Sequence, residues 1–171
     1  MRTSRQPIRS LDRLDRKILG VLQGDGRISM KDLAEAVGLT ITPCIERVKR
    51  LERDGVIIGY YARLNPALLG SALLVFVEIS LNNKSGNMFE QFRREVLRIP
   101  EVLECHLVSG DFDYLIKARI REIGEYRRLL GDILLQLPGA AQSKSYVVME
   151  EIKETLAIAV DAKESSVSGT A

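Results

Sequence analysis

The stretch VSGDFDYLI, residues 108–116, places two carboxylates behind a glycine and between two apolar runs. Carboxylates in such a loop can bind a metal ion, bind the ammonium group of a ligand, or hydrogen-bond to their own backbone in a turn. A metal site needs more ligands than Asp111 and Asp113, and the sequence offers one histidine and no CxxC motif. We therefore expect no metal here, and the stretch is either a plain turn or a ligand-binding loop.

Cys105 and His106 are the one adjacent cysteine and histidine, the residue types that could act as nucleophile and base. Neighbouring residues on a strand point to opposite faces of a sheet, so the two side chains cannot meet without distortion. The sequence also lacks a glycine-rich phosphate loop. We expect a buried cysteine, a hydrogen-bonded histidine, no cofactor and no enzymatic activity.

The chain as a whole has 171 residues, 46% of them hydrophobic, which is enough for one large domain or two small ones. Its first residues, MRTSRQPIRS, contain no apolar signal core, and its longest apolar stretch, residues 72–81, is interrupted by Glu78. That stretch is also too short to cross about 30 Å of hydrocarbon. These features predict a cytoplasmic protein with reduced thiols and no membrane partner.

Positive charge is concentrated at the front of the chain. Residues 1–63 hold 13 Lys and Arg against 8 Asp and Glu, a net charge of +5, whereas the remainder holds 12 against 15, a net charge of −3. A polyanion would therefore bind to the front third.

Three helices are predicted in this basic third. Apolar residues at three- and four-residue steps predict the first helix over residues 11–23. Ser29 is a suitable N-cap for a second helix over residues 30–37, which ends at Gly38. Thr40 is suited to cap a third helix over residues 41–54, where Pro43 falls in the first turn and needs no intrahelical bond.

The second and third helices, joined by a short glycine turn, form a helix-turn-helix pattern whose last helix would enter the major groove of DNA. The predicted DNA-binding residues are Thr42, Pro43, Glu46, Arg47, Lys49, Arg50 and Arg53. A merely solvated basic face is the alternative, but the turn, the cap and the local charge favour double-stranded DNA.

Individual roles on this helix are partly open. Arg47 and Arg50 could contact bases or phosphates. Glu46 could accept from a cytosine amino group, although an intrahelical pair with Arg50 is favoured. Glu52 projects toward the apolar side, so we expect it to meet a basic partner from another helix.

The remaining residues predict a strand or wing over 56–65 and then two β-α-β units. The predicted strands are 73–81, 102–109, 113–120 and 144–152, and the predicted helices are 88–99 and 123–137. This order is a split ferredoxin-like domain, with helices on one face of a four-stranded antiparallel sheet. Apolar positions on both faces of LLVFVEISL and SYVVMEEI predict a homodimer that buries the uncovered face of the sheet.

Several ordered blocks carry a family resemblance: TPCIERVKRLERDGVI, LLVFVEISL, FEQF, ECHLVSGDFDYLIK, YRRLLG and YVVMEE. Together they resemble the Lrp/AsnC family over roughly residues 10 to 155. The resemblance implies an α+β protein with a winged helix-turn-helix domain (residues 11–59), a β-strand linker (60–70) and a ferredoxin-like βαββαβ domain of the RAM or ACT type (71–155). Residues 1–10 would be a flexible arm and residues 156–171 a tail.

The resemblance also implies a function. A family member is a transcriptional regulator of amino acid metabolism genes, associated with the nucleoid, whose dimers assemble into octamers and whose DNA binding responds to a small amino acid. Leucine is the first effector expected, because the blocks are most similar to those of leucine-responsive members. The alternative is an amino-acid-sensing regulatory subunit that acts on an enzyme without binding DNA, which the basic third helix disfavours.

In this family the loop between the second and third strands receives the effector at a contact between dimers, and VSGDFDY matches that loop. The implied effector residues are Leu107, Val108, Ser109, Gly110, Asp111, Phe112, Asp113 and Tyr114, with Leu135, Tyr146, Val147 and Val148 as neighbours. Asp111 or Asp113 could accept from the ammonium group of the amino acid, and the choice between them is open.

Overall fold

The computed structural model describes residues 10–82, 85–136 and 139–160, and gives the backbone alone for residues 130 and 132–136. The chain divides into two compact units. Unit 1 comprises residues up to Arg63 together with residues from Glu154 onward, and unit 2 comprises Leu64–Lys153. The predicted arm over residues 1–9 and the tail over 161–171 lie outside the described residues.

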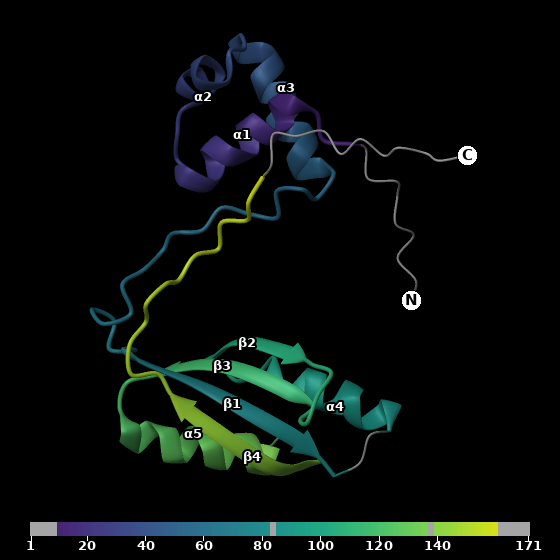
Figure 1. The fold of residues 1–171 in the computed structure, drawn as a ribbon, viewed down its shortest axis with the longest axis vertical. Coiled ribbons are helices and arrows are strands. Elements are labelled where there is room, and N and C mark those ends of the chain that lie inside the picture. Colours follow the sequence, from purple (N-terminus) through teal and green to yellow (C-terminus); the bar gives the residue numbers. More distant parts are fainter. Residues whose placement is uncertain (1–9, 83–84, 137–138, 161–171) are drawn as a thin grey trace. The chain divides into compact units, whose positions relative to one another are not determined.

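Unit 1 contains three helices, α1 (Arg13–Gly24), α2 (Met30–Val37) and α3 (Ile41–Arg53) (Figure 1). α1 begins with a capping box, in which Asp12 and Asp15 each accept a hydrogen bond from the other's backbone N–H. The predicted Ser29 cap is confirmed, since its hydroxyl oxygen accepts from the Asp32 N–H at 3.1 Å. Thr40 occupies the N-cap of α3 but its side chain makes no capping hydrogen bond.

The turn between α2 and α3 depends on Gly38, whose φ of +76° lies in the left-handed region that favours glycine. The next residue, Leu39, donates a hydrogen bond from its N–H to the Ala34 carbonyl at 2.8 Å, which closes the end of α2. The three helices then bury one apolar cluster, formed by Ile18, Leu22, Leu33, Ala34, Val37, Cys44, Val48 and Leu51.

Residues 56–65, for which the sequence predicted a wing or a strand, form no strand. Within the described residues this segment is extended but belongs to no sheet, and Pro66–Gly70 forms turns. Side chains such as Ile58 and Tyr61 are 87% and 81% exposed there. Its β-branched and aromatic composition suits a strand, but a strand also needs a partner edge, and none of the four described strands pairs with this segment.

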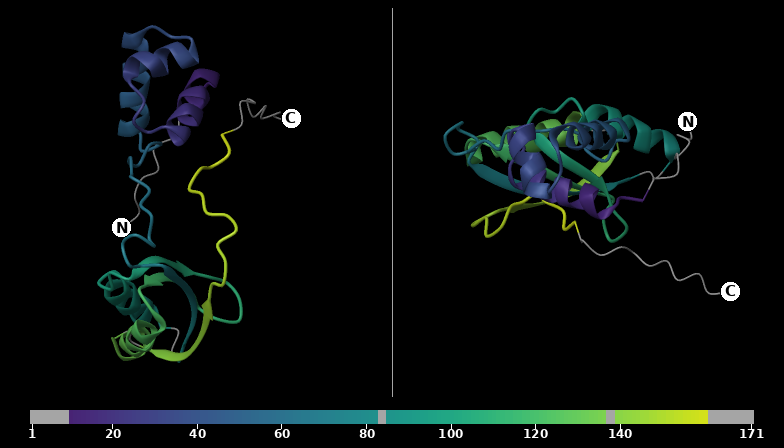
Figure 2. Two further views of the ribbon diagram at one scale, coloured as in Figure 1. Left: turned by 90° about the vertical axis from the view of Figure 1, so that its left-hand side faces the viewer. Right: turned by 90° about the horizontal axis from the view of Figure 1, so that it is seen from above.

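Unit 2 has the predicted ferredoxin-like arrangement. Its sheet consists of β1 (Leu73–Leu81), β2 (Val102–Leu107), β3 (Tyr114–Ile120) and β4 (Ala140–Val147), in the order β2-β3-β1-β4 with every pairing antiparallel. The helices α4 (Gly86–Val96) and α5 (Ile123–Gln136) lie on one face of the sheet (Figure 2, left). The core lies between this face and the two helices, and it includes Val75, Val77, Ile79, Phe92, Ile116 and Ala118.

The bounds of β4 and α4 differ most from the predicted ones. β4 covers residues 140–147, not 144–152, and α4 begins at Gly86 and ends at Val96. The register of β4 is set by β1, since Val75 faces Val147 and Leu81 faces Ala140. The apolar run at Tyr146–Met149 had suggested a later strand, but pairing with β1 decides its ends.

The uncovered face of the sheet is more polar than predicted. The alternate residues of β1 and β3 that point away from the helices include Glu78, Lys117 and Arg119. Lys117 pairs with Glu104 at 3.0 Å and Arg119 with Glu151 at 2.6 Å. Leu74 and Phe76 are the apolar residues that β1 adds to this face.

A segment after β4 returns to unit 1. The side-chain amide of Gln23, on α1, donates to the Ile158 carbonyl at 2.9 Å and accepts from the Ile158 N–H at 2.6 Å. Arg63 and Glu154 form an ion pair at 3.3 Å. Among the described helices, none is long and apolar enough to cross a membrane.

Candidate functional sites

The helix α3 has one buried side and one exposed side. Cys44, Val48 and Leu51 are buried against α1 and α2, as the spacing predicted. On the other side, five of the predicted DNA-binding residues are exposed: Thr42, Pro43, Glu46, Lys49 and Arg53. Pro43 lies in the first turn of the helix, where its missing N–H leaves no intrahelical bond unmade.

Arg47 and Arg50 are placed differently from the other five. Arg47 Nη1 lies 2.6 Å from Asp12 Oδ2 and 2.7 Å from Asp15 Oδ1, and Arg50 Nη2 lies 2.6 Å from the same Asp15 oxygen. Their side chains are 23% and 27% exposed, and the Asp15 side chain is 4% exposed. The hydrogen bond to Asp12 raises the pKa of Arg47 against the opposing effect of burial.

These ion pairs replace the intrahelical pair between Glu46 and Arg50 that the spacing favoured. Arg50 is directed to α1, so that expectation is wrong. The sequence held a signal for the true partner. Asp15 lies on the stripe of α1 that also carries Ile18 and Leu22, and an acid on a buried stripe requires a charged or hydrogen-bonding partner.

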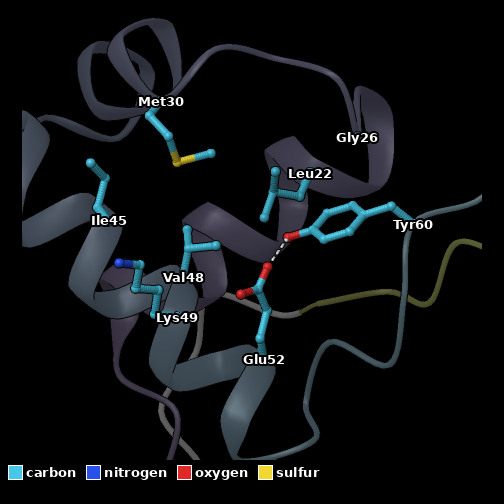
Figure 3. A pocket seen from close by; sticks show the side chains of 8 residues that line it. All are labelled: Leu22, Gly26, Met30, Ile45, Val48, Lys49, Glu52 and Tyr60. Carbon is cyan, nitrogen blue, oxygen red and sulfur yellow. Dashed lines mark hydrogen bonds between the residues drawn. The ribbon is translucent and has the colours of Figure 1, made fainter.

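Glu52 has a partner other than the predicted basic one. It accepts a hydrogen bond from the Tyr60 hydroxyl at 3.0 Å, as Figure 3 shows. Burial and the hydrogen bond to Glu52 raise the pKa of Tyr60. Beside this bond lies a pocket of about 360 Å³, lined by Leu22, Gly26, Met30, Ile45, Val48, Lys49, Glu52 and Tyr60. Lys49 points away from the Tyr60–Glu52 bond (Figure 3).

The loop between β2 and β3 is closed by its own backbone. The Val108 N–H donates to the Asp113 carbonyl at 2.9 Å, and the Asp113 N–H donates to the Ile79 carbonyl of β1 at 2.9 Å. Ser109, Gly110 and Asp111 are exposed at the tip. The loop is therefore both a turn and an accessible surface.

The two acids of this loop have different environments. Asp113 is 7% exposed, and its Oδ2 accepts from the Leu81 N–H at 2.9 Å, which ties the loop to the end of β1. Asp111 is exposed. Asp113 thus has a structural partner that the sequence could not reveal, since Leu81 is 32 residues away.

The residues that flank the loop are also divided between core and surface. Tyr114 is 6% exposed and stacks on Phe92 with ring centroids 3.9 Å apart, so it belongs to the core. Phe112 and Val108 are half-buried, and Leu107 is 61% exposed.

Val147 and Val148, from the second group of predicted effector residues, lie at the opposite end of β1 from the loop within one chain. The Val148 N–H bonds to the Leu74 carbonyl and Val147 faces Val75, at the start of β1, whereas the loop contacts the end of β1. Seven residues of strand separate these ends by about 23 Å. Tyr146 donates to Glu78 at 2.9 Å, and the Leu135 side chain lies outside the described part of the chain.

Cys105 and His106 behave as the strand geometry predicted. Cys105 faces Ile116 on the core side, where burial raises the pKa of its thiol to about 11. His106 lies on the other face, with Nε2 3.2 Å from Glu104. The two side chains do not form a nucleophile and base pair.

Comparison with known proteins identifies both units. Residues 11–58 match a winged helix-turn-helix DNA-binding family, and residues 74–158 match the Lrp/AsnC ligand binding domain. The leucine-responsive regulatory protein of Escherichia coli K12 is 55% identical over 153 residues, which is 90% of this chain and 93% of the relative. That of Serratia marcescens is 56% identical over 151 residues, covering 88% and 92%.

Solved structures agree in fold. A transcriptional regulator from Neisseria meningitidis in complex with L-methionine is 35% identical with a TM-score of 0.84, covering 89% of this chain and 98% of that one. An AsnC family regulator from Agrobacterium tumefaciens is 36% identical with a TM-score of 0.83, covering 86% and 96%. The chain is thus a DNA-binding transcription regulator with an amino-acid-responsive domain. It belongs to the Lrp/AsnC family.

Proposed function

We propose that the exposed side of α3 enters the major groove of double-stranded DNA, with Thr42, Pro43, Glu46, Lys49 and Arg53 as the contacting residues. The observation that carries this proposal is the two-sided character of α3, whose buried residues pack on α1 and α2 while these five remain accessible. In this proposal Lys49 and Arg53 neutralise phosphates or reach base edges, and Thr42 and Pro43, at the start of the helix, approach the sugar-phosphate backbone of the DNA.

A salt titration tests the DNA contacts. Each phosphate contact that is lost should lower the slope of log affinity against log salt concentration by about 0.9. We expect Lys49→Ala and Arg53→Ala to weaken binding and to lower this slope. Lys17→Ala is the matched control, because it removes the same charge from the exposed side of α1. If Lys17→Ala weakens binding as much as Lys49→Ala does, α3 is not the contacting helix.

We propose further that the amino acid effector binds at the loop between β2 and β3, with Asp111 as the acceptor for its ammonium group. This choice is supported by the exposure of Asp111 and by the engagement of Asp113 with the Leu81 N–H. Leucine is the first candidate, since the curated relatives are leucine-responsive, and methionine is the second, since the Neisseria regulator was solved with L-methionine.

Isothermal calorimetry with leucine and methionine tests the effector site. Asp111→Asn should weaken binding at least about tenfold, because loss of a charge-assisted hydrogen bond is worth about 1.5 to 3 kcal/mol. Glu150→Gln, which removes an exposed acid elsewhere in unit 2, should bind normally. Wild-type affinity in Asp111→Asn would place the ammonium group elsewhere.

The protein acts, in this proposal, as a homodimer that assembles into octamers on the nucleoid in the cytoplasm. The uncovered sheet face, with Leu74 and Phe76 among its ion pairs, is the surface offered to the dimer partner. The separation of the loop from Val147 and Val148 within one chain supports a pocket completed by a second copy. Light scattering with and without leucine tests the assembly, and a monomer under both conditions would contradict it.

Genes of amino acid metabolism are the targets we propose for this regulator, because the effector would report on the pool that those genes control. The proposal predicts that chromatin immunoprecipitation recovers promoters of such genes, and that recovery changes when leucine is supplied. If the recovery of these promoters does not change with any amino acid tested, the proposed DNA binding stands but the proposed sensing role is contradicted.

A further inference from the structure

We infer that Asp15 is a positioning residue for DNA binding, which holds α3 against α1 through Arg47 and Arg50. Asp15 does not itself face DNA, since its side chain is 4% exposed and lies at the start of α1. The inference rests on the proposed contact of α3 with DNA, but it concerns how α3 is held and not which residues touch the duplex.

The first step is the burial of a carboxylate. A buried charge is stable only when it is paired and hydrogen-bonded. Asp15 Oδ1 receives both guanidinium groups, at 2.7 and 2.6 Å, and Oδ2 accepts from the Asp12 N–H at 3.2 Å. Both oxygens are therefore satisfied, and two of the three bonds come from α3.

The second step concerns direction. Cys44, Val48 and Leu51 attach α3 through apolar contacts, which keep this stripe buried but, being non-directional, define the rotation of the helix less sharply than hydrogen bonds do. Charge-assisted hydrogen bonds are directional. Because Arg47 and Arg50 are one turn apart and converge on a single oxygen, the pairs fix the rotation of α3.

The third step links rotation to recognition. Successive side chains are about 100° apart around a helix axis. A rotation of α3 by a fraction of that angle would therefore turn Lys49 and Thr42 away from the groove and bring their neighbours toward it. Asp15, together with the Asp12 carboxylate that also holds Arg47, therefore fixes which side of α3 is presented. In this role Arg47 and Arg50 act as positioning residues and not as DNA contacts.

The sign of one substitution tests the inference. Asp15→Asn removes a negative charge, so electrostatics alone would tighten DNA binding. Positioning predicts the opposite, a loss of roughly fivefold or more with an unchanged salt slope. Asp32→Asn is the matched control, because Asp32 occupies the same third position of a helix and its carboxylate accepts from the Ser29 hydroxyl at the N-cap, but it has no arginine partner among the described residues. It should bind as tightly as wild type or slightly more tightly.

DNA affinity is measured with the full chain and one duplex, which the wild type has selected from a randomised library. The temperature is kept well below the thermal midpoint of each variant. A residue important only for stability would lower that midpoint and leave affinity unchanged. Arg50→Gln should weaken binding with no change in salt slope, and combining it with Asp15→Asn should add little further loss. Asp15→Glu, which keeps the charge, should recover part of the affinity.

Two results would overturn the inference. One is Asp15→Asn binding as tightly as Asp32→Asn, and the other is a slope lowered by about one in Arg47→Gln or Arg50→Gln, the signature of a phosphate contact. If Asp15→Asn does not fold, the slopes of the two arginine variants decide the matter. Failure of Lys49→Ala and Arg53→Ala to affect binding would instead contradict the proposed interface.

Discussion

At the scale of single residues, identical side chains in one motif have different tasks. Asp111 and Asp113 are two positions apart, yet one is exposed and the other closes the end of β1 through the Leu81 N–H. Arg47 and Arg53 share a helix, yet one is held by α1 and the other is 72% exposed. Composition identifies such residues as candidates, and tertiary neighbours decide among them.

Asp113→Ala should destabilise unit 2 by about 1 to 3 kcal/mol, because a buried N–H would lose its acceptor. Asp111→Ala should change the free energy of unfolding by no more than about 0.5 kcal/mol, as expected for an exposed position. Urea denaturation followed by circular dichroism measures both. Equal stability of the two variants would contradict the structural role of Asp113.

The Arg47–Asp12 pair should give a pH-dependent stability. Burial raises the pKa of Asp12, but hydrogen bonds from Arg47 and from the helix backbone outweigh it, so the pKa lies below its usual 3.8. A lowered pKa means that the stabilisation is present above pH 3.8 and is lost as the pH falls through the folded-state value. The difference in Tm between wild type and Asp12→Asn should therefore be largest near neutrality and shrink below pH 3.8. A Tm difference that does not change with pH would show that the Arg47–Asp12 pair does not contribute to stability.

At the scale of elements, periodicity and capping rules predicted the helices well, because their signals are local. Ser29 and Gly38 mark the two ends of α2 by side-chain and backbone chemistry that needs no distant partner. Strands were less predictable, since the ends of β4 are set by its pairing with β1, and residues 56–65 have strand-like composition but no pairing edge in the described part of the chain. The partners of Arg47 and Arg50 were also beyond local rules, because they lie more than 30 residues away.

Two glycine substitutions separate turn geometry from helix propensity. Gly38→Ala should cost about 1 to 2 kcal/mol, because it forces a Cβ into the left-handed region at φ +76°. Gly20→Ala, in the middle of α1 with open space around it, should stabilise by about 0.5 to 1 kcal/mol. Thermal unfolding of both variants provides the comparison. A neutral Gly38→Ala would mean that the turn relaxes to another conformation.

At the scale of the whole molecule, the chain crosses between its two units twice. The chain leaves unit 1 after Arg63 and rejoins it at Glu154. In the sequence, all residues of unit 2 therefore stand between the helices of unit 1 and its last segment. The Gln23–Ile158 bonds and the Arg63–Glu154 pair attach that segment to unit 1. Unit 1 is therefore assembled from two parts of the sequence.

Gln23→Leu should release the returning segment while preserving the size of the side chain. We expect the Ile158 amide to exchange its hydrogen rapidly in this variant and slowly in the wild type, because its acceptor is the Gln23 side chain. Amides in β1 and β3 should exchange at unchanged rates in both proteins. Equal exchange at Ile158 would show that the segment is not held by Gln23.

The double crossing has a consequence for synthesis on the ribosome. The three helices of unit 1 emerge first and bury their cluster early, and the sheet follows, since domains fold as units during translation. Residues 154–160 emerge only afterwards. The contacts that Gln23 and Arg63 make with them are thus the last to form in each newly made chain, after the three helices of unit 1 and the sheet of unit 2 have folded.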